Sequence, residues 1–178
     1  MADNSTKNIE DVQIGDYVIA YNDETKTFEQ RKVIKSYPHY NTPRVLEITL
    51  SNGVVLGITP GHPLLTVNGW KSRDIANSRW EHNTIASWLN LGDEVIGYYG
   101  NAKISHIREL NIPDNYITYN IEVETCHTFM VEGLVVHNAK AASSAKGNVA
   151  LASGTKKTLM GELGPELVVS GGKYFLVG

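Results

Sequence analysis

The segment NIEVETCHTFMVEGLVVHN carries the residues best suited to chemistry, which are His127 and the adjacent pair His137 and Asn138. An asparagine side-chain amide can attack its own main-chain carbonyl, which closes a five-membered succinimide and releases the following residue as a free amine. This reaction is slow unaided, because the amide nitrogen is a poor nucleophile and the amine is a poor leaving group. Imidazole titrates near neutral pH, and each well-placed general acid or base contributes on the order of 10²–10⁴-fold in rate. The pattern therefore predicts cleavage of the peptide bond after Asn138.

A second group of reactive side chains lies earlier, in the segment GITPGHP, where Thr59 and His62 flank a Pro-Gly turn. A hydroxyl and an imidazole on one turn can hydrogen-bond a strained peptide and protonate its departing amine. A Thr-x-x-His turn is more often structural, and so is a lone His-Asn dipeptide. Their occurrence in this order, followed by a change of composition directly after Asn138, favours the catalytic interpretation.

The elements that must position these groups are short β-strands separated by turn-forming residues. The Glu132-Gly133 turn can fold its segment into a hairpin and so return His127 to Asn138. We therefore expect an all-β domain. The runs of β type are Asp16–Tyr21, Arg31–Tyr37, Arg44–Leu50, Val54–Thr59, Asp93–Tyr99, Ala102–Ile107, Tyr116–Val123 and Leu134–Val136.

One stretch, 72–91, departs from the β pattern. Its Trp80, Ile85 and Leu89 are spaced so that one or two helical turns can form. The remaining histidines have no ligand spacing and are interpreted as ordinary surface or hydrogen-bonded side chains: His39, His82 and His106.

Composition excludes several classes of function. The chain has 178 residues, 42% of them hydrophobic, and a net charge of -3 without a basic stripe, so no nucleic-acid partner is expected. A single cysteine, Cys126, excludes an intramolecular disulfide and a thiolate zinc cluster, and no metal or cofactor is expected. The amino terminus is polar and the sequence has no long apolar run, so we expect neither secretion nor a membrane partner. A cytoplasmic location in a bacterial host is expected.

The composition changes after Asn138. Residues 139–157 are small, polar and positively charged, which is typical of a linker, and seven of the sixteen glycines lie from Gly147 onward. Residues 158–178 resume with two short apolar runs around a Gly-Gly pair, which can form a hairpin only with support, because an isolated hairpin is marginal in water. We therefore place a domain boundary between residues 138 and 139.

Four segments, in order, resemble successive conserved blocks of inteins, the protein-splicing elements with a Hint domain: VQIGDYVIAYND, GITPGHPLLT, WLNLGDEVIG and YNIEVETCHTFMVEGLVVHN. The resemblance covers nearly all of residues 1–138. It implies a horseshoe-like, pseudo-two-fold β fold in which both ends of the element meet at one centre. It also implies that Thr59 and His62 activate the upstream junction, whereas His127, His137 and Asn138 cleave the downstream one. The short interval after His62 leaves no room for the endonuclease of larger inteins.

Three features depart from the intein pattern. The first strand, with its Cys or Ser nucleophile, is missing before the VQIGD block, which suggests a split intein whose short amino-terminal fragment is a separate polypeptide; a truncated chain would look the same. Ala139, after the scissile bond, replaces the usual Cys, Ser or Thr and cannot act as a nucleophile, which fits a trapped mutant or a cleavage-only variant. Asn120 stands where the family often has Asp.

Cys126 has two interpretations. Some inteins without a terminal nucleophile use an internal cysteine to form a branched thioester, but they carry it at the position that Asn120 occupies here, six residues earlier. A small, partly buried strand residue is therefore the favoured interpretation of Cys126.

The segment SGTKKTLMGELGPELVVSGGKYFLVG resembles a stretch of phage tail tape-measure proteins. The resemblance implies that residues 139–178 are the C-extein, a piece of the host protein carried in cis, and that the host is a virion component. The predicted function is single-turnover, autocatalytic protein splicing in trans with a separate amino-terminal fragment, in which Asn138 cyclises. The alternative is an inactive intein relic within a phage tail protein.

Overall fold

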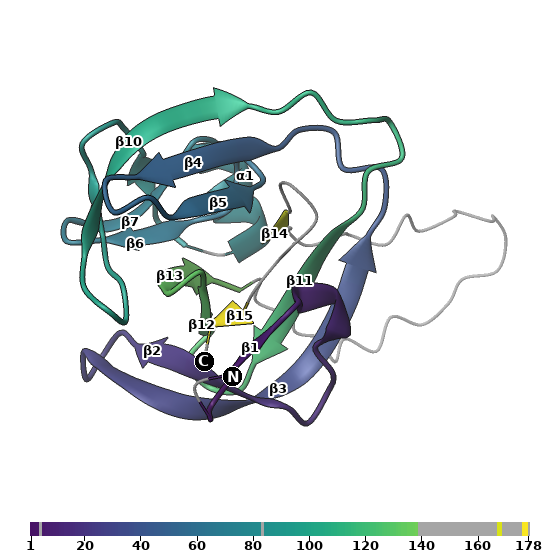
Figure 1. The fold of residues 1–178 in the computed structure, drawn as a ribbon, viewed down its shortest axis with the longest axis vertical. Coiled ribbons are helices and arrows are strands. Elements are labelled where there is room, and N and C mark those ends of the chain that lie inside the picture. Colours follow the sequence, from purple (N-terminus) through teal and green to yellow (C-terminus); the bar gives the residue numbers. More distant parts are fainter. Residues whose placement is uncertain (4, 83, 139–166, 169–175, 178) are drawn as a thin grey trace, which may run out of the picture.

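The computed structural model describes residues 1–3, 5–82, 84–138, 167–168 and 176–177. The described chain folds into strands that curl around a central hairpin (Figure 1). Its helices are η1 (Ile9–Asp11) and α1 (Ile75–His82). Its strands are β1 (Thr6–Lys7), β2 (Tyr17–Asn22), β3 (Thr27–His39), β4 (Leu46–Leu50), β5 (Val55–Ile58), β6 (Leu64–Thr66), β7 (Gly69–Ser72), β8 (Ser87–Trp88), β9 (Glu94–Val95), β10 (Ala102–Glu109), β11 (Thr118–Val123), β12 (Thr128–Val131), β13 (Leu134–His137), β14 (Leu167–Val168) and β15 (Leu176–Val177).

Thirteen of the described strands form one continuous path of neighbours, in the order β1-β15-β12-β13-β6-β9-β10-β4-β5-β14-β11-β3-β2. Off this path, β7 pairs with β6 and with β8. In Figure 1, β4, β5 and β10 form one arm and β2, β3 and β11 form the other, with β12 and β13 between them. The arms are antiparallel ladders: β4 pairs with β5 and β10, and β3 pairs with β2 and β11. This arrangement confirms the all-β, horseshoe-like fold expected from the sequence.

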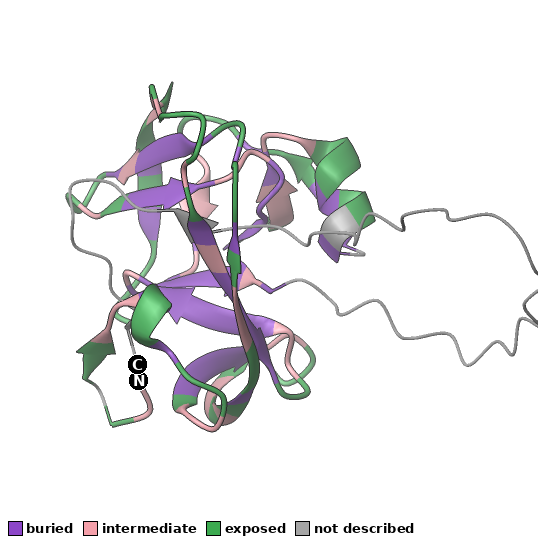
Figure 2. Cartoon of the chain, turned by 90° about the vertical axis from the view of Figure 1, so that its right-hand side faces the viewer, coloured by how far each residue is buried: buried purple, intermediate pink, exposed green. Residues whose placement is uncertain are grey.

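The central strands are buried on both faces, because they lie between two hydrophobic clusters. Alternate residues of β12 enter different clusters: Phe129 and Val131 join the larger one and Met130 joins the smaller. The same alternation sends Leu64 of β6 into the larger cluster and Leu65 into the smaller. This sorting follows from the period of two in a strand, and Figure 2 shows the resulting buried interior.

A tight turn joins β12 to β13, as the sequence predicts. Glu132 (φ 50°) and Gly133 (φ 78°) occupy the two turn positions, and positive φ at both is the geometry of the two-residue turn that matches strand twist. The register pairs Thr128 with His137. The hairpin therefore returns the start of its segment to the His137-Asn138 pair, which confirms the expectation made from Glu132-Gly133.

Helix α1 forms within the stretch where helical turns were expected, but the residues that suggested it do not form its buried face. Trp80 is 73% exposed and Ile85, beyond the helix, is 89% exposed. Asp74 caps the helix, since its Oδ1 accepts from the Asn77 N–H at 3.0 Å. Among the side chains of α1 that the structure describes, the buried ones are Ser78 and His82, one turn apart. This helix therefore presents a polar face to the interior.

The described residues of the carboxy-terminal segment pair with the β domain and not with each other. Leu167 and Val168 of β14 lie between β5 and β11, and β15 lies between β1 and β12. The expected linker 139–157 and the junction residue Ala139 fall outside the described residues. In the described part of the chain, neither helix is long and apolar enough to cross a membrane.

Candidate functional site

Backbone pairing brings the two reactive segments of the sequence together. Val136 of β13 pairs with Leu64 of β6, and the His137 N–H donates to the Pro63 carbonyl at 3.2 Å. The adjacent His62 closes its own turn, because its N–H donates to the Thr59 carbonyl at 3.1 Å. The Thr59/His62 turn and the His137-Asn138 pair therefore lie beside each other in the fold.

Asn138 is fully buried, and main-chain groups hold its side chain. The Asn138 N–H donates to the His127 carbonyl at 2.9 Å. The hydrogen-bonding neighbours assign the amide orientation: Nδ2 donates to the same His127 carbonyl at 2.8 Å, and Oδ1 accepts from the Val123 N–H at 2.7 Å. Both ends of the amide are therefore fixed by main-chain groups rather than by mobile side chains.

The Asn138 carbonyl oxygen faces two imidazole rings. His137 Nδ1 lies 2.5 Å from this oxygen and His82 Nδ1 lies 3.2 Å from it. A carbonyl oxygen only accepts hydrogen bonds, so each of these nitrogens carries a proton and donates. Two preorganised N–H groups aimed at one carbonyl oxygen are the arrangement that stabilises a developing oxyanion.

Three histidines lie in a row at this centre. The rings of His62 and His82 are 5.1 Å apart and those of His82 and His137 are 5.5 Å apart, each pair edge to face. Trp70 closes one end, with its ring 4.9 Å from that of His137. Within the described ranges, no three or more His, Cys, Asp or Glu side chains are grouped so as to hold a metal ion. The row is therefore a set of imidazoles in edge-to-face contact.

Burial keeps these imidazoles neutral. It lowers the pKa of His62 to about 3, with a further contribution from the charge of His137. Burial lowers the pKa of His137 to about 4, although its hydrogen bond to Asn138 acts in the opposite direction. Burial, followed by the charges of the other two rings, lowers the pKa of His82 well below its ordinary value. At neutral pH the three rings therefore act as neutral hydrogen-bonding groups.

Thr84 connects two of these histidines. Its Oγ1 lies 2.9 Å from Nε2 of His137 and 3.1 Å from the main-chain carbonyl of His82. The residue follows the end of α1 and is buried. Nothing in the spacing of the sequence distinguishes Thr84, and His82 was expected to be an ordinary histidine. The structure instead brings both into contact with the reactive pair.

His127 contacts Asn138 through its main chain. Its φ of 52° is unusual for a residue with a Cβ and turns its carbonyl towards Asn138. Its Nδ1 is buried and has no hydrogen-bond partner among the described residues. The charge of the His127 ring contributes to lowering the pKa of His137. His127 was expected to act through its ring, but its hydrogen bonds to Asn138 are made by its main-chain carbonyl.

Thr59 and His62, the pair expected to act at the upstream junction, differ in their burial. Thr59 is half-buried at the end of β5, whereas His62 is fully buried. Neither ring nitrogen of His62 has a hydrogen-bond partner within the part of the chain that the structure describes. A buried polar atom without a partner carries a free-energy cost, so such atoms in a folded protein call for an explanation.

The two accessory positions, Asn120 and Cys126, lie in β11 and in the turn before β12. Asn120 is buried in β11, and its Oδ1 accepts from the Ile121 N–H at 2.8 Å. Cys126 is partly buried, as expected, but lies in the turn before β12 rather than in a strand. Its Sγ donates to Glu29 Oε1 at 3.1 Å, and burial followed by this bond raises the pKa of the thiol. The thiolate form is therefore disfavoured at Cys126.

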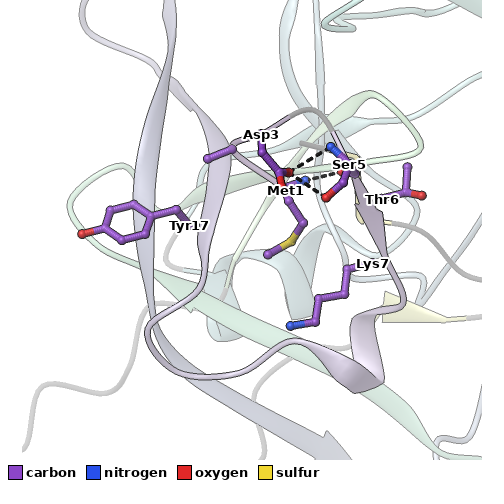
Figure 3. A pocket seen from close by; sticks show the side chains of 7 residues that line it. Met1, Asp3, Ser5, Thr6, Lys7 and Tyr17 are labelled. Atoms are coloured by element: carbon purple, nitrogen blue, oxygen red, sulfur yellow. Dashed lines mark hydrogen bonds between the residues drawn. The ribbon is translucent and has the colours of Figure 1, made fainter.

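A surface cavity of about 400 Å³ lies beside the start of the chain (Figure 3). The amino group of Met1 donates to the Ser5 carbonyl there, and the Asp3 carboxylate accepts from Ser5. Lys7 and Tyr17 form the other walls. None of these residues belongs to the histidine row, so the cavity is separate from the candidate site.

No protein-family model and no curated protein matches the sequence. Solved structures do. A bacterial intein-like domain from Clostridium thermocellum is 27% identical, with a TM-score of 0.59 over 73% of this chain and 86% of that one. A DnaB intein from Synechocystis sp. PCC 6803 is 19% identical, with a TM-score of 0.56 over 74% and 84% of the two chains. The gp41-1 intein is 22% identical, with a TM-score of 0.55 over 74% and 87%.

Proposed function

Because the described part of this chain forms a Hint domain of the intein type, we propose that the chain is a protein-splicing element that cleaves its downstream junction by cyclisation of Asn138. One observation carries the proposal. The Asn138 amide is held by the His127 carbonyl and the Val123 N–H, while its own carbonyl oxygen accepts from the Nδ1–H of His137. Both reacting groups of the asparagine are thus oriented before any reaction begins.

The bond changes balance without water or any added reagent. Nδ2 of Asn138 attacks the carbonyl carbon of the same residue, and the oxygen becomes negative beside His137. The bond to the nitrogen of residue 139 then breaks, and the carbonyl reforms within a succinimide. Nδ2 loses one proton and the departing amine gains one. His137 is the imidazole best placed to assist this transfer, because it already donates to the reacting carbonyl oxygen.

We further propose that an amino-terminal fragment on a separate polypeptide supplies the Cys or Ser nucleophile of the upstream junction. The support is His62, whose buried ring nitrogens have no hydrogen-bond partner among the described residues. A polypeptide segment added beside the Thr59/His62 turn would provide one. Strand addition to a sheet is a general mode of such docking.

We propose that residues 139–178 are the C-extein of a phage tail tape-measure protein made in a bacterial cytoplasm. Ala139 has a methyl side chain, which cannot accept an acyl group. Cleavage after Asn138 is therefore the reaction proposed for this junction, and ligation would need a different acceptor.

The test is the intact mass of the purified full chain after prolonged incubation near neutral pH. It is recorded with and without a synthetic peptide that supplies a Cys-initiated first strand. We expect two fragments that meet at the bond after Asn138, and faster scission with the peptide.

Two variants control this test. Asn138→Ala removes the amide that attacks and should stay intact. Asn115→Ala changes an exposed asparagine on a loop and should cleave normally. An unchanged mass of the unmodified chain in both tubes would contradict the proposal and favour an inactive relic.

A further inference from the structure

His82 has no evident structural reason to be a histidine. It lies at the end of α1, is 1% exposed, and its ring sits between those of His62 and His137. Its Nε2 has no hydrogen-bond partner among the described residues. A half-satisfied imidazole in a core costs free energy that an apolar side chain of similar size would avoid. The polar contact that it does make therefore deserves a chemical explanation.

That contact fixes the tautomer of His82. Its Nδ1 lies 3.2 Å from the Asn138 carbonyl oxygen, which can only accept, so the proton is on Nδ1. Burial keeps the pKa of His82 well below its ordinary value, so the ring is neutral and Nε2 carries a lone pair. His82 thus presents one N–H group to the bond that the proposed reaction breaks.

We propose that His82 is a catalytic residue of the downstream cleavage, whose Nδ1–H stabilises the Asn138 carbonyl oxygen as it becomes negative. This inference rests on the proposed function, because it assigns a further residue to the same reaction. His82 transfers no proton: it donates a hydrogen bond that strengthens with the charge on oxygen and weakens again when the carbonyl reforms. Together with His137, it completes a pair of donors on one oxygen.

Thr84 is the positioning residue of this pair. Its single hydroxyl proton can go to Nε2 of a neutral His137 or to the His82 carbonyl, since Oγ1 is 2.9 Å and 3.1 Å from them. When His137 takes up a second proton, its Nε2–H donates to Thr84 Oγ1 and the hydroxyl proton turns to the carbonyl. Thr84 therefore satisfies both protonation states of His137 while holding the end of α1 in place.

The kinetic test compares substitutions of His82 in the full chain, with scission after Asn138 followed by intact mass. His82→Leu removes the donor, and we expect the rate constant to fall by about 10²–10³-fold, the usual effect of losing one oxyanion donor. His82→Asn places an amide N–H near the position of Nδ1 and should recover part of the rate. His106→Leu alters an exposed histidine and is the matched control. Far-UV circular dichroism verifies that each variant is folded.

A second readout does not depend on the rate. Nitrogen-15 NMR of the histidine rings in the uncleaved full chain reports which nitrogen carries the proton, and His82→Asn identifies the signals of His82. We expect Nδ1 of His82 to carry the proton and Nε2 to be unprotonated.

The outcomes separate this inference from the proposed function. If the unmodified chain cleaves and a folded His82→Leu chain cleaves equally fast, His82 has no catalytic role although the proposed function stands. A proton on Nε2 of His82 in place of Nδ1 would likewise exclude the catalytic role of His82 and leave the proposed function standing. If the unmodified chain does not cleave at all, the proposed function and the role of His82 fail together.

Discussion

Among single residues, the buried histidines make the free energy of unfolding depend on pH. In the unfolded chain an imidazole takes up a proton below its ordinary pKa of 6.5, whereas the pKa of folded His62 is lowered to about 3 and that of His137 to about 4. Between these values the unfolded state binds more protons than the folded state. The free energy of unfolding must therefore fall as the pH falls from about 6.5 towards 4. The same burial that keeps the rings neutral for hydrogen bonding makes the fold sensitive to acid.

This reasoning predicts the outcome of urea titrations at pH 7 and pH 4.5. Each pKa unit by which folding shifts a group corresponds to 1.36 kcal/mol, so each such histidine should account for a loss of up to about 2–3 kcal/mol over this interval. Replacing His62 by Gln should remove its share, so that this variant loses less stability at pH 4.5 than the unmodified chain. His106→Gln, on the surface, should lose as much as the unmodified chain. Equal losses in all three proteins would mean that His62 is protonated in the folded state.

The residues of the site were predictable to the extent that they share a local motif. Thr59 and His62 are close in sequence, and His137 is next to Asn138, so their proximity could be inferred from spacing, while their chemistry stays a prediction. His82 is 56 residues from its carbonyl partner, and its helix buries a polar face that no hydrophobic pattern reveals. The main-chain carbonyl of His127 was also unpredictable, because its direction depends on a positive φ.

At the scale of elements, runs of β-type residues between turn-forming residues were the easiest to predict, including runs that are buried on both faces, such as β11. β4, β5, β10 and β11 appear close to their expected ranges. β6 and β12 were not singled out as strands. They are three and four residues long and buried throughout, and a short apolar run without alternation does not by itself indicate a strand. The strand expected over Asp93–Tyr99 is shorter in the structure, where β9 spans only Glu94–Val95. The expected helical turns exist, but the exposed Trp80 suggested them for the wrong reason.

The turn between β12 and β13 gives the prediction that belongs to this scale. Gly133→Ala should lower the free energy of unfolding by about 1 kcal/mol or more, because φ there is 78° and a Cβ disfavours such a backbone. The new Cβ would also lie 3.3 Å from the Tyr99 ring. Because this turn sets the register that pairs Thr128 with His137, scission after Asn138 should slow as well. Urea denaturation and intact mass measure the two effects.

Gly53→Ala is the matched control for the turn. Gly53 also has a positive φ, of 86°, but a Cβ there meets nothing within 4 Å. The Gly53→Ala variant should lose stability through backbone strain alone and should cleave at the rate of the unmodified chain. If Gly133→Ala cleaves as fast as Gly53→Ala, the hairpin register does not limit the reaction.

At the scale of the whole molecule, the fold has to assemble groups that are far apart in the sequence. The hydrogen-bond partners of Asn138 come from the end of α1, from β11 and from the turn before β12. The β domain also pairs with β14 and β15 of the segment that was expected to be a passenger, a contact that short apolar runs in a glycine-rich sequence could not predict. The proposed reactive centre is therefore a property of the assembled domain rather than of the His-Asn dipeptide.

This dependence on assembly predicts how cleavage responds to denaturant. In a urea series at neutral pH, the rate constant for scission after Asn138 should follow the folded fraction measured by near-UV circular dichroism. The rate should fall because unfolding separates Asn138 from its donors, while an unfolded asparagine cyclises only at the slow unassisted rate. Asn138→Ala gives the baseline at each urea concentration. Scission that continues undiminished in the fully unfolded chain would mean that the dipeptide reacts alone, and the contacts from α1, β11 and the hairpin would then have no part in the chemistry.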